Sequence, residues 1–205
     1  MSYLFIDTSD HLVLGLLNSD YEWIEFIETT DKKSSASIHS KIYNLLEKNG
    51  LKIKEIKALF QIAGPGSYTG MRMSEGISQV LEWQNIPIYS FYHFVIPQIL
   101  GIDKGAWISR AFKGEIFLYE WRGEQTKKSL HKESELPQLE SSLGGELGEF
   151  WTHFSQSFPE IPNSTGDLVK KDARRLFSFI AKSQSREKPF YYRSLENEFT
   201  VSLKP

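Results

Sequence analysis

The sequence predicts an α/β protein whose first half is a mixed sheet covered by helices, and three observations indicate this fold class. Strand-like runs at residues 3–6, 12–17 and 21–28 follow one another with only turns between them, which is typical of an antiparallel meander. A helix with one apolar face then leads to a buried strand at residues 58–63. A glycine-rich loop joins that strand to a second amphipathic helix. This order of elements combines a meander with crossover connections.

Both predicted helices of the first half carry apolar residues at helical spacing. In the first helix these residues are Ile38, Ile42, Leu45 and Leu46. In the second helix they are Met73, Ile77, Val80 and Leu81. The first helix ends near Asn49-Gly50, a natural C-terminal cap, and Ser67 or Thr69 can cap the start of the second. A further short strand at residues 86–90 precedes a weaker helix at 91–100 that Pro97 interrupts.

The second half of the chain begins a new strand pattern. Its strand-like runs lie at residues 106–112, 115–121 and 125–130, the first two joined at Lys113-Gly114. Residues 131–162 give no firm prediction, although 147–154 fit a strand or a short helix. The region 167–181 has the apolar spacing of one helix. An aromatic stretch at 189–193 then indicates a strand or an extended segment.

The amino-acid composition excludes several classes of protein. The 205 residues carry a formal net charge of −2, so no global basic field is available to hold a nucleic acid. The absence of cysteine excludes disulfides and thiolate chemistry and fits a reducing compartment. The N-terminus lacks the basic region of a signal peptide, and no apolar run approaches the ~20 residues of a membrane span. We therefore expect a cytoplasmic protein.

The loop Gly64-Pro65-Gly66-Ser67-Tyr68-Thr69-Gly70-Met71-Arg72 is the most distinctive stretch. A strand, a glycine turn and a helix N-terminus can together receive an anion. The loop lacks the Gly-Lys-Ser/Thr ending of a phosphate loop, and its third glycine falls one residue too late for the dinucleotide pattern. Geometry alone leaves two interpretations open, a tight strand-to-helix connection or a phosphate-binding loop. The turn Asp7-Thr8-Ser9 has the same two interpretations, with a metal as a further ligand.

No catalytic machinery is evident in the sequence. No two of the five histidines lie at i, i+3 or i, i+4, so we expect surface or packing roles for them and no metal ion. A Ser-His-Asp triad is not excluded by residue types, but no Gly-x-Ser-x-Gly elbow is present. Tyr191 and Tyr192 beside Arg193 could stack on bases, but we prefer strand packing as the explanation because the chain has a net negative charge and no basic stripe. We expect no cofactor.

Three segments resemble one protein family. The glycine-rich loop resembles the Gly-Pro-Gly-Ser-Phe/Tyr-Thr-Gly-Leu/Val-Arg signature of the TsaB (YeaZ) family. The opening Ile6-Asp7-Thr8-Ser9 is similar to the N-terminal hairpin of that family, and Pro189-Phe190-Tyr191-Tyr192-Arg193 is similar to its C-terminal Pro-x-Tyr-Leu-Arg. The matches come in the family's order and span most of the chain.

This resemblance implies an actin-like, ribonuclease H-like (ASKHA) fold of two lobes, each a mixed sheet with helices and the second one reduced. The expected lobes are residues 1–100, which bind the partner, and 101–205. The resemblance also implies a noncatalytic subunit of the complex that makes N6-threonylcarbamoyladenosine at position 37 of tRNA. Its expected partners are a TsaD-like transferase and a TsaE-like ATPase. We also expect that the protein can form a homodimer when it is alone. We expect it to contact tRNA only through the complex and not to associate with a membrane.

The resemblance implies two sets of site residues. Candidates for a nucleotide or phosphate loop are Asp7, Thr8, Ser9, Gly64, Gly66, Ser67, Thr69, Gly70 and Arg72. Candidates for the partner interface, on the outer faces of the two helices, are Ile38, Ile42, Tyr43, Gly70, Met73, Gly76 and Ile77. The alternatives are a small-molecule kinase or a peptidase of the same fold, and an unrelated mixed-sheet binding module.

Overall fold

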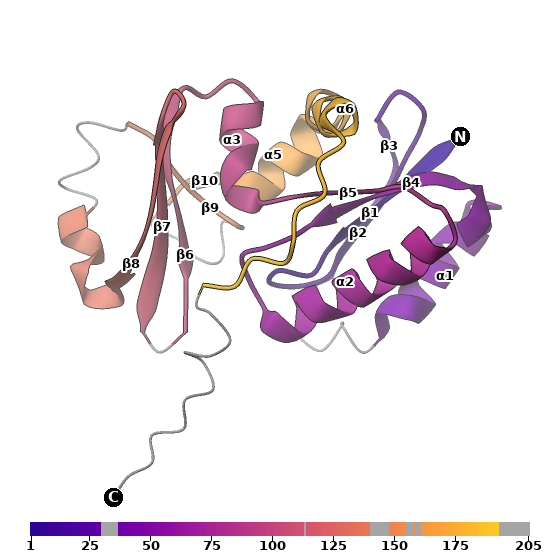
Figure 1. Cartoon of the computed structure of the whole chain (residues 1–205), viewed down its shortest axis with the longest axis horizontal. Helices are drawn as coiled ribbons and strands as arrows, with labels where there is room; N and C mark the ends of the chain where they lie inside the picture. The colour runs from indigo at the N-terminus through magenta and orange to yellow at the C-terminus, as the bar shows by residue number, and fades with distance from the viewer. Residues whose placement is uncertain (30–36, 113, 140–147, 155–157, 159–160, 193–205) are drawn as a thin grey trace, which may run out of the picture.

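Two five-stranded sheets, each accompanied by helices, make up the protein (Figure 1). The computed structural model describes residues 1–29, 37–112, 114–139, 148–154, 158 and 161–192. We refer to the parts built on the first and second sheets as the first and second lobes. This arrangement is the two-lobed, mixed-sheet fold that the sequence predicts. The predicted division at residue 100 stays a prediction.

The first sheet has the order β3-β2-β1-β4-β5 and combines two kinds of pairing. Strands β1 (Ser2–Asp7), β2 (Val13–Leu17) and β3 (Trp23–Glu28) form the predicted antiparallel meander. Strands β4 (Ile56–Ile62) and β5 (Ile88–Phe91) are parallel to β1. The carboxyl ends of β1, β4 and β5 therefore meet at one edge, where polar side chains from distant parts of the chain can gather.

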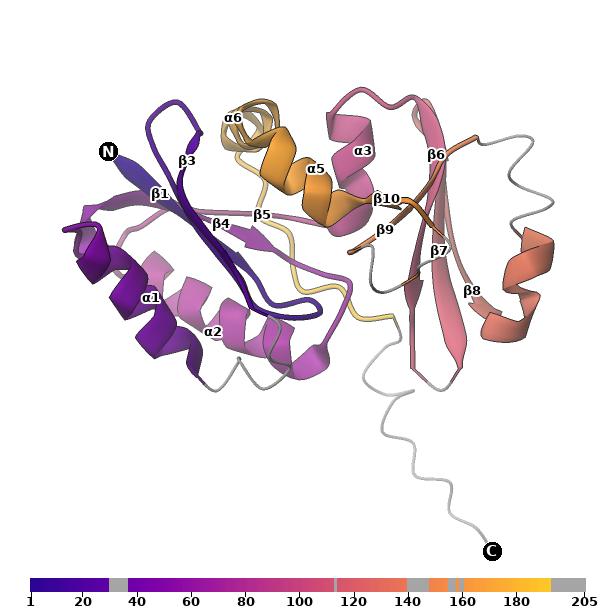
Figure 2. The same ribbon diagram turned by 180° about the vertical axis from the view of Figure 1, so that it is seen from behind.

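Helices α1 (Ile38–Lys48) and α2 (Tyr68–Trp83) cover one face of this sheet, with a short 3₁₀ turn, η2 (Ile53–Glu55), leading into β4 (Figure 2). The four predicted apolar positions of α1 are all buried. Of the four apolar positions of α2, Ile77 and Leu81 are buried, whereas Val80 is 47% exposed. The helix also turns Ser74 and Ser78 toward the sheet, where both bond to Gln61. A count of apolar spacing alone misses such a buried polar contact.

The opposite face of the first sheet is aromatic and is covered by elements from both halves of the chain. These are α3 (Ile96–Ile99), α5 (Thr165–Lys171) and α6 (Ala173–Ser183). The 3₁₀ turn η3 (His93–Val95), just before α3, packs its apolar residues against the second sheet instead. Phe177 of α6 packs against Phe5, Phe60 and Phe91 of the sheet. The helix α6 thus returns to the first lobe after the chain has built the second (Figure 1).

Two helix predictions are wrong in their bounds. The weak helix expected at 91–100 is a strand end followed by short helical turns, and Pro97 lies at the start of α3 rather than interrupting a helix. The single helix expected at 167–181 is two helices that meet at Asp172, whose backbone leaves the helical region. The apolar spacing continues across this break because both helices pack against the same aromatic face.

The second sheet has the order β10-β9-β6-β7-β8. Strands β6 (Lys104–Arg110), β7 (Glu115–Arg122) and β8 (Gln125–Lys132) confirm the three predicted runs. A 3₁₀ turn, η4 (Glu133–Glu135), and the short strands β9 (Phe150–Thr152) and β10 (Asn163–Ser164) follow. Aromatic residues of this sheet pack against Phe94 and Phe190, which come from outside it.

Residues 184–192 form an extended segment, which we call the strap, that runs from α6 between the two lobes (Figure 2). The Ser90 backbone N–H donates to the Ser185 carbonyl, and the Phe190 N–H donates to the Ala63 carbonyl. Its beginning is fixed to α2 by Arg186, which pairs with Glu75 and Glu82. None of the helices in the described part of the chain has the length and hydropathy of a membrane span.

Candidate functional site

The glycine-rich loop is packed against the turn that follows β1. A Cβ atom on Gly66 would lie 2.1 Å from the Ser9 carbonyl oxygen, and one on Gly70 would lie 2.2 Å from the Thr8 carbonyl oxygen. Both distances are far below any real contact, so glycine is required at both positions for the two backbones to approach. The Ser67 N–H donates to the Ser9 carbonyl oxygen at 2.5 Å. The concave side of the loop is therefore filled by the protein's own backbone.

The start of α2 uses its own side chain as a cap. Ser67 Oγ accepts a hydrogen bond from the Gly70 N–H at 3.3 Å, which confirms one of the two predicted caps. The Met71 N–H donates to the Ser67 carbonyl. Within the loop, amides of three residues are thus engaged by the protein itself, which leaves less of the helix N-terminus available to an anion than the sequence alone indicates.

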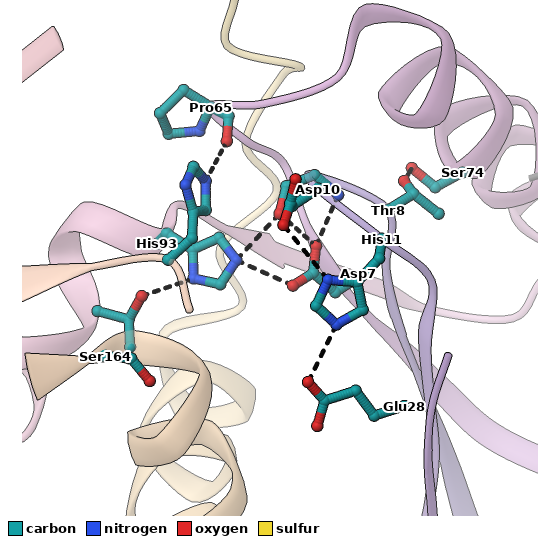
Figure 3. A network of polar contacts seen from close by, with 12 residues as sticks. Asp7, Thr8, Asp10, His11, Glu28, Pro65, Ser74, His93 and Ser164 are labelled. Atoms are coloured by element: carbon teal, nitrogen blue, oxygen red, sulfur yellow. Dashed lines mark hydrogen bonds and ion pairs between the residues drawn. The ribbon is translucent and has the colours of Figure 1, made fainter. Parts of the chain in front are cut away.

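Behind the loop lies a buried polar cluster at the carboxyl ends of the parallel strands (Figure 3). Asp7, the last residue of β1, places Oδ2 2.9 Å from Nε2 of His93, which follows β5. Ser9 Oγ donates to Asp7 Oδ1 at 2.6 Å and lies 3.1 Å from the same His93 nitrogen. All three residues are at most 3% exposed. We call this cluster, together with Thr165 and His153, the lobe joint.

The other end of the His93 ring contacts the start of α5. Its Nδ1 lies 2.9 Å from Thr165 Oγ1, and Thr165 in turn donates to the Thr152 carbonyl oxygen. Trp107 Nε1 of the second sheet also donates to Thr165. Both ring nitrogens of His93 therefore have a hydrogen-bond partner. Through His93 the first sheet is tied to the second lobe.

A second histidine ties the second lobe to the glycine-rich loop. His153 Nε2 donates to the Pro65 carbonyl oxygen at 2.6 Å. The two buried imidazoles meet edge to face, with ring centroids 4.6 Å apart. His11 extends the cluster outward, since its ring bridges Asp10 and Glu28. Three of the five histidines thus gather here, although they lie far apart in sequence.

Burial and neighbouring charges in the lobe joint shift the pKa values of Asp7 and His153. Burial would raise the pKa of Asp7, but the charge of His93 and hydrogen bonds from His93 and Ser9 together lower it from 3.8 to about 2. Burial and the charge of His93 lower the pKa of His153 from 6.5 to about 3. Burial also acts to lower the pKa of His11, yet its acidic neighbours Asp10, Asp7 and Glu28 raise it overall. At neutral pH the joint holds an Asp7 carboxylate and a neutral His153.

The combination of Asp7, His93 and Ser9 has the residue types of a hydrolytic triad, but its geometry does not suit that chemistry. A nucleophilic serine must hand its proton to the histidine and face a substrate. Here Ser9 Oγ donates to Asp7 itself and is buried. The cluster therefore acts as a structural connection. Among the described residues, no group of three or more acidic and histidine side chains is arranged to hold a metal ion.

A second feature lies on the outer side of the first lobe. An apolar groove of about 890 Å³ runs between α1 and α2, and we call it the α1–α2 groove. Five of the seven predicted interface residues line it: Ile42, Tyr43, Met73, Gly76 and Ile77. The other two do not, because Ile38 is fully buried and Gly70 is already approached by the Thr8 carbonyl.

The groove exposes apolar side chains to solvent. Tyr43 is 61% exposed and Val80 is 47% exposed. A Cβ atom on Gly76 would meet nothing within 4 Å, so space is open above this residue. Exposed apolar patches of this kind are typical of binding surfaces. Arg72 and Lys52 contribute positive charge to the lining, and Glu47 contributes negative charge.

Comparisons with known proteins agree on one relationship. No family model matches the chain. It is 26% identical over 198 residues to the tRNA threonylcarbamoyladenosine biosynthesis protein TsaB of Escherichia coli, covering 86% of this chain and 81% of that protein. It is also 32% identical over 90 residues to the protein of the same name from Bacillus subtilis, which covers 43% of this chain and 39% of that protein. The chain is thus similar to proteins of the TsaB (YeaZ) family, as its motifs predict.

Solved structures agree with this fold. YeaZ from Pseudomonas aeruginosa superimposes with a TM-score of 0.59 at 15% identity, covering 93% of this chain and all of that one. A protein described as similar to peptidase YeaZ, also from P. aeruginosa, gives a TM-score of 0.62 at 15% identity over 94% of this chain and 99% of that one. At this identity the likeness concerns the fold.

The three segments that resemble the TsaB family meet in space. The opening turn supports the glycine-rich loop at Gly66 and Gly70, as described above. The closing segment reaches the same place, because the Phe190 carbonyl oxygen would lie 2.9 Å from a Cβ on Gly64. Arg193, the last residue of that match, lies outside the described residues. The segments that resemble TsaB motifs thus mark the junction of the two lobes.

The nucleotide-loop candidates differ in how far they are buried. The buried group is Asp7, Thr8, Ser9, Gly64 and Gly70. Gly66 is half-buried, whereas Ser67, Thr69 and Arg72 are exposed. Arg72 donates to the Tyr68 hydroxyl and lines the groove. The structure brings these residues together, but around backbone contacts rather than around an open pocket.

Sequence reasoning missed His93 and His153 as members of the cluster. A signal for His93 was present, since it lies two residues after a parallel strand, as Gly64 does after β4. The carboxyl ends of parallel strands meet, so polar residues at these places are expected neighbours. His153 follows the short strand β9, in a region with no firm prediction, and no sequence signal places it there.

Proposed function

We propose that this protein is a noncatalytic scaffold subunit of the complex that makes N6-threonylcarbamoyladenosine at position 37 of tRNA. It would pair with a TsaD-like transferase through the α1–α2 groove, with a TsaE-like ATPase joining the pair. Contact with tRNA would come through the complex, in the cytoplasm. The similarity to the two proteins named TsaB supports the pathway, and the groove supports a role in binding another protein.

The observation that carries this proposal is the position of the predicted interface residues. Five of them, drawn from both helices, line one continuous apolar groove on the surface. A helix of a partner could lie along α2 at Gly76, where the absence of a side chain leaves space. Helix-in-groove recognition uses apolar contacts of this kind. In the isolated protein the same groove could also pair two copies of the chain.

The lobe joint supports a noncatalytic role. Its polar groups bond to each other across the two lobes, and its members are buried. A catalytic site needs polar groups that can reach a substrate, with at least one nucleophile, acid or base facing an open cavity. The loop that could hold a phosphate is occupied by the carbonyls of Thr8 and Ser9. These contacts favour a structural use of the residues.

The interface is tested by adding bulk at the open glycine. Gly76→Arg is expected to abolish copurification with the TsaD-like partner, because the new side chain fills the groove. Gln79→Arg is the matched control, since Gln79 is exposed on the same helix but does not line the groove. Circular dichroism checks that both variants are folded. Wild-type yields of partner with Gly76→Arg would place the interface elsewhere.

The pathway is tested separately. Depletion of the protein, followed by mass analysis of tRNA nucleosides, is expected to lower threonylcarbamoyladenosine. An unchanged level would remove the pathway from the proposal. The alternative of a kinase or peptidase of the same fold requires a ligand for the chain alone. Calorimetry with ATP and magnesium is expected to give no micromolar binding, and such binding would favour the kinase.

A further inference from the structure

The strap carries the chain out of the fold beside the start of α2. Tyr191 packs against Tyr68, the first residue of α2, with ring centroids 5.0 Å apart. Tyr192 is fixed on the other side by a 2.6 Å hydrogen bond to Ser109 of the second sheet. The direction and position of residue 192 are therefore set by both lobes. The residues that follow it start from a defined point.

That point lies close to one end of the α1–α2 groove. The guanidinium of Arg72, which lines the groove, donates to the Tyr68 hydroxyl at 2.9 Å. From Tyr68 to Gly76, within the groove, is about 12 Å along the helix at 1.5 Å per residue. A chain extends by about 3.3 Å per residue, so eight or nine residues after Tyr192 span this distance with length to spare.

The remaining sequence has the composition that the groove would accept. Residues 193–205 carry Phe199, Val201 and Leu203 in alternation, which gives an extended segment one apolar side. Between Arg193 and these apolar residues come two acids, Glu196 and Glu198, and Lys204 follows. The groove presents Arg72 at the end nearest to the strap and apolar side chains beyond it. In the segment the two acids precede the apolar residues, just as Arg72 precedes the apolar lining of the groove.

We propose that residues 193–205 bind in the α1–α2 groove of their own chain, with Phe199, Val201 and Leu203 against its apolar lining. We call this segment the tail. Attachment within a few residues of the groove gives the tail a local concentration in the millimolar range, which favours it over the same segment of a second copy. If the groove is the partner site of the proposed function, the tail competes with the partner and must be displaced before the two proteins pair.

The absence of cysteine makes a direct test possible. In the full-length chain, Gly76→Cys is combined with Val201→Cys; the first position has open space for the new side chain. Oxidation by glutathione is expected to form an intramolecular disulfide at least tenfold faster than in a control pair. The control joins Val201→Cys to Lys182→Cys, an exposed position on α6, which covers the opposite face of the first sheet.

Two results would overturn the proposal. Equal rates of disulfide formation in the two pairs would show that the tail does not prefer the groove. Disulfides mainly between two chains, seen as dimers on a non-reducing gel, would show that a second copy occupies the groove instead. Circular dichroism and thermal unfolding of the reduced variants check that both pairs are folded.

The consequence for the partner has its own measurement, which depends on the proposed function. Phe199→Asp with Val201→Asp is expected to release the tail and to increase affinity for the TsaD-like protein by about three- to tenfold, as expected when a competing segment is removed. Unchanged affinity would exclude competition. If no variant binds that protein, the proposed function fails, while the disulfide rates still decide whether the tail occupies the groove.

Discussion

The lobe joint and the α1–α2 groove differ in what their side chains contact: those of the joint bond to other protein groups, and those of the groove face solvent. In the joint, Asp7, His93 and His153 are buried and each has a hydrogen-bond partner within the protein. In the groove, Tyr43 and Val80 turn apolar surface to solvent, and Gly76 leaves space above α2. Residue types with catalytic potential thus serve to hold the lobes together, and ordinary apolar residues form the surface available for binding.

The difference between the joint and the groove is tested first by substituting two glycines of α2, one at each place. Gly70→Ala is expected to lower the free energy of unfolding by about 3 kcal/mol, because its Cβ would overlap the Thr8 carbonyl and force the joint apart. Gly76→Ala is expected to raise it by up to about 1 kcal/mol through helix propensity, since the new methyl meets nothing. Urea unfolding measures both. Similar effects of the two substitutions would contradict the difference in packing.

The second test measures how the stability of the protein changes as the pH falls. His153 has a folded pKa of about 3, below its unfolded value near 6.5, so the unfolded state binds the proton first. Its contribution to stability is present above pH 6.5 and is lost as pH falls toward 3, with a slope of about 1.4 kcal/mol per pH unit. Unfolding of the wild type between pH 7 and 5 is therefore expected to lose about 2 kcal/mol from this residue.

His153→Gln removes the titrating group and keeps a donor for the Pro65 carbonyl. The variant is expected to be less stable at pH 7 but to show a flatter pH profile between 6.5 and 5. His39→Gln is the matched control, since His39 is exposed at the groove and outside the joint. A profile for His153→Gln as steep as that of the wild type would mean that another group dominates the acid response.

The smallest expected change in stability comes from the groove. Tyr43 is mostly exposed, and its hydroxyl donates to Glu47 on the surface. Tyr43→Ala is expected to alter the free energy of unfolding by less than about 0.5 kcal/mol. Its affinity for the TsaD-like protein, measured by calorimetry, is expected to fall about tenfold or more, as for aromatic contacts at interfaces. A large loss of stability with unchanged affinity would reverse the roles assigned to the two regions.

Most of the fold could be predicted because the first sheet and its two covering helices have strong local patterns. The buried face of α1 is visible as apolar residues three and four apart, and the turns of the meander are polar. The face of α2 toward the sheet could not be predicted in the same way. Ser74 and Ser78 are buried there because Gln61 of β4 bonds to both, a match between two elements that no single segment displays.

The candidate sites show the same limit. Glycine at positions 66 and 70 signalled a close approach, but the sequence does not say what approaches. The structure gives the answer as the turn after β1 rather than a phosphate. His93 and His153 lie 60 residues apart, and their contact depends on how the second lobe is placed. The groove was predictable at five residues because helical spacing alone decides which side chains share an outer face.

The late return of α6 to the first sheet affects how the protein can fold as it is made. Phe177 packs against Phe5, Phe60 and Phe91. It is synthesised 86 residues after Phe91, the last of these three. At bacterial or eukaryotic rates of about 5–20 residues per second, that interval is roughly 4–17 s. Throughout it, the aromatic face of the nascent sheet lacks the cover that α5 and α6 provide. Ribosome-associated chaperones are therefore expected to engage the growing polypeptide before its last helix emerges.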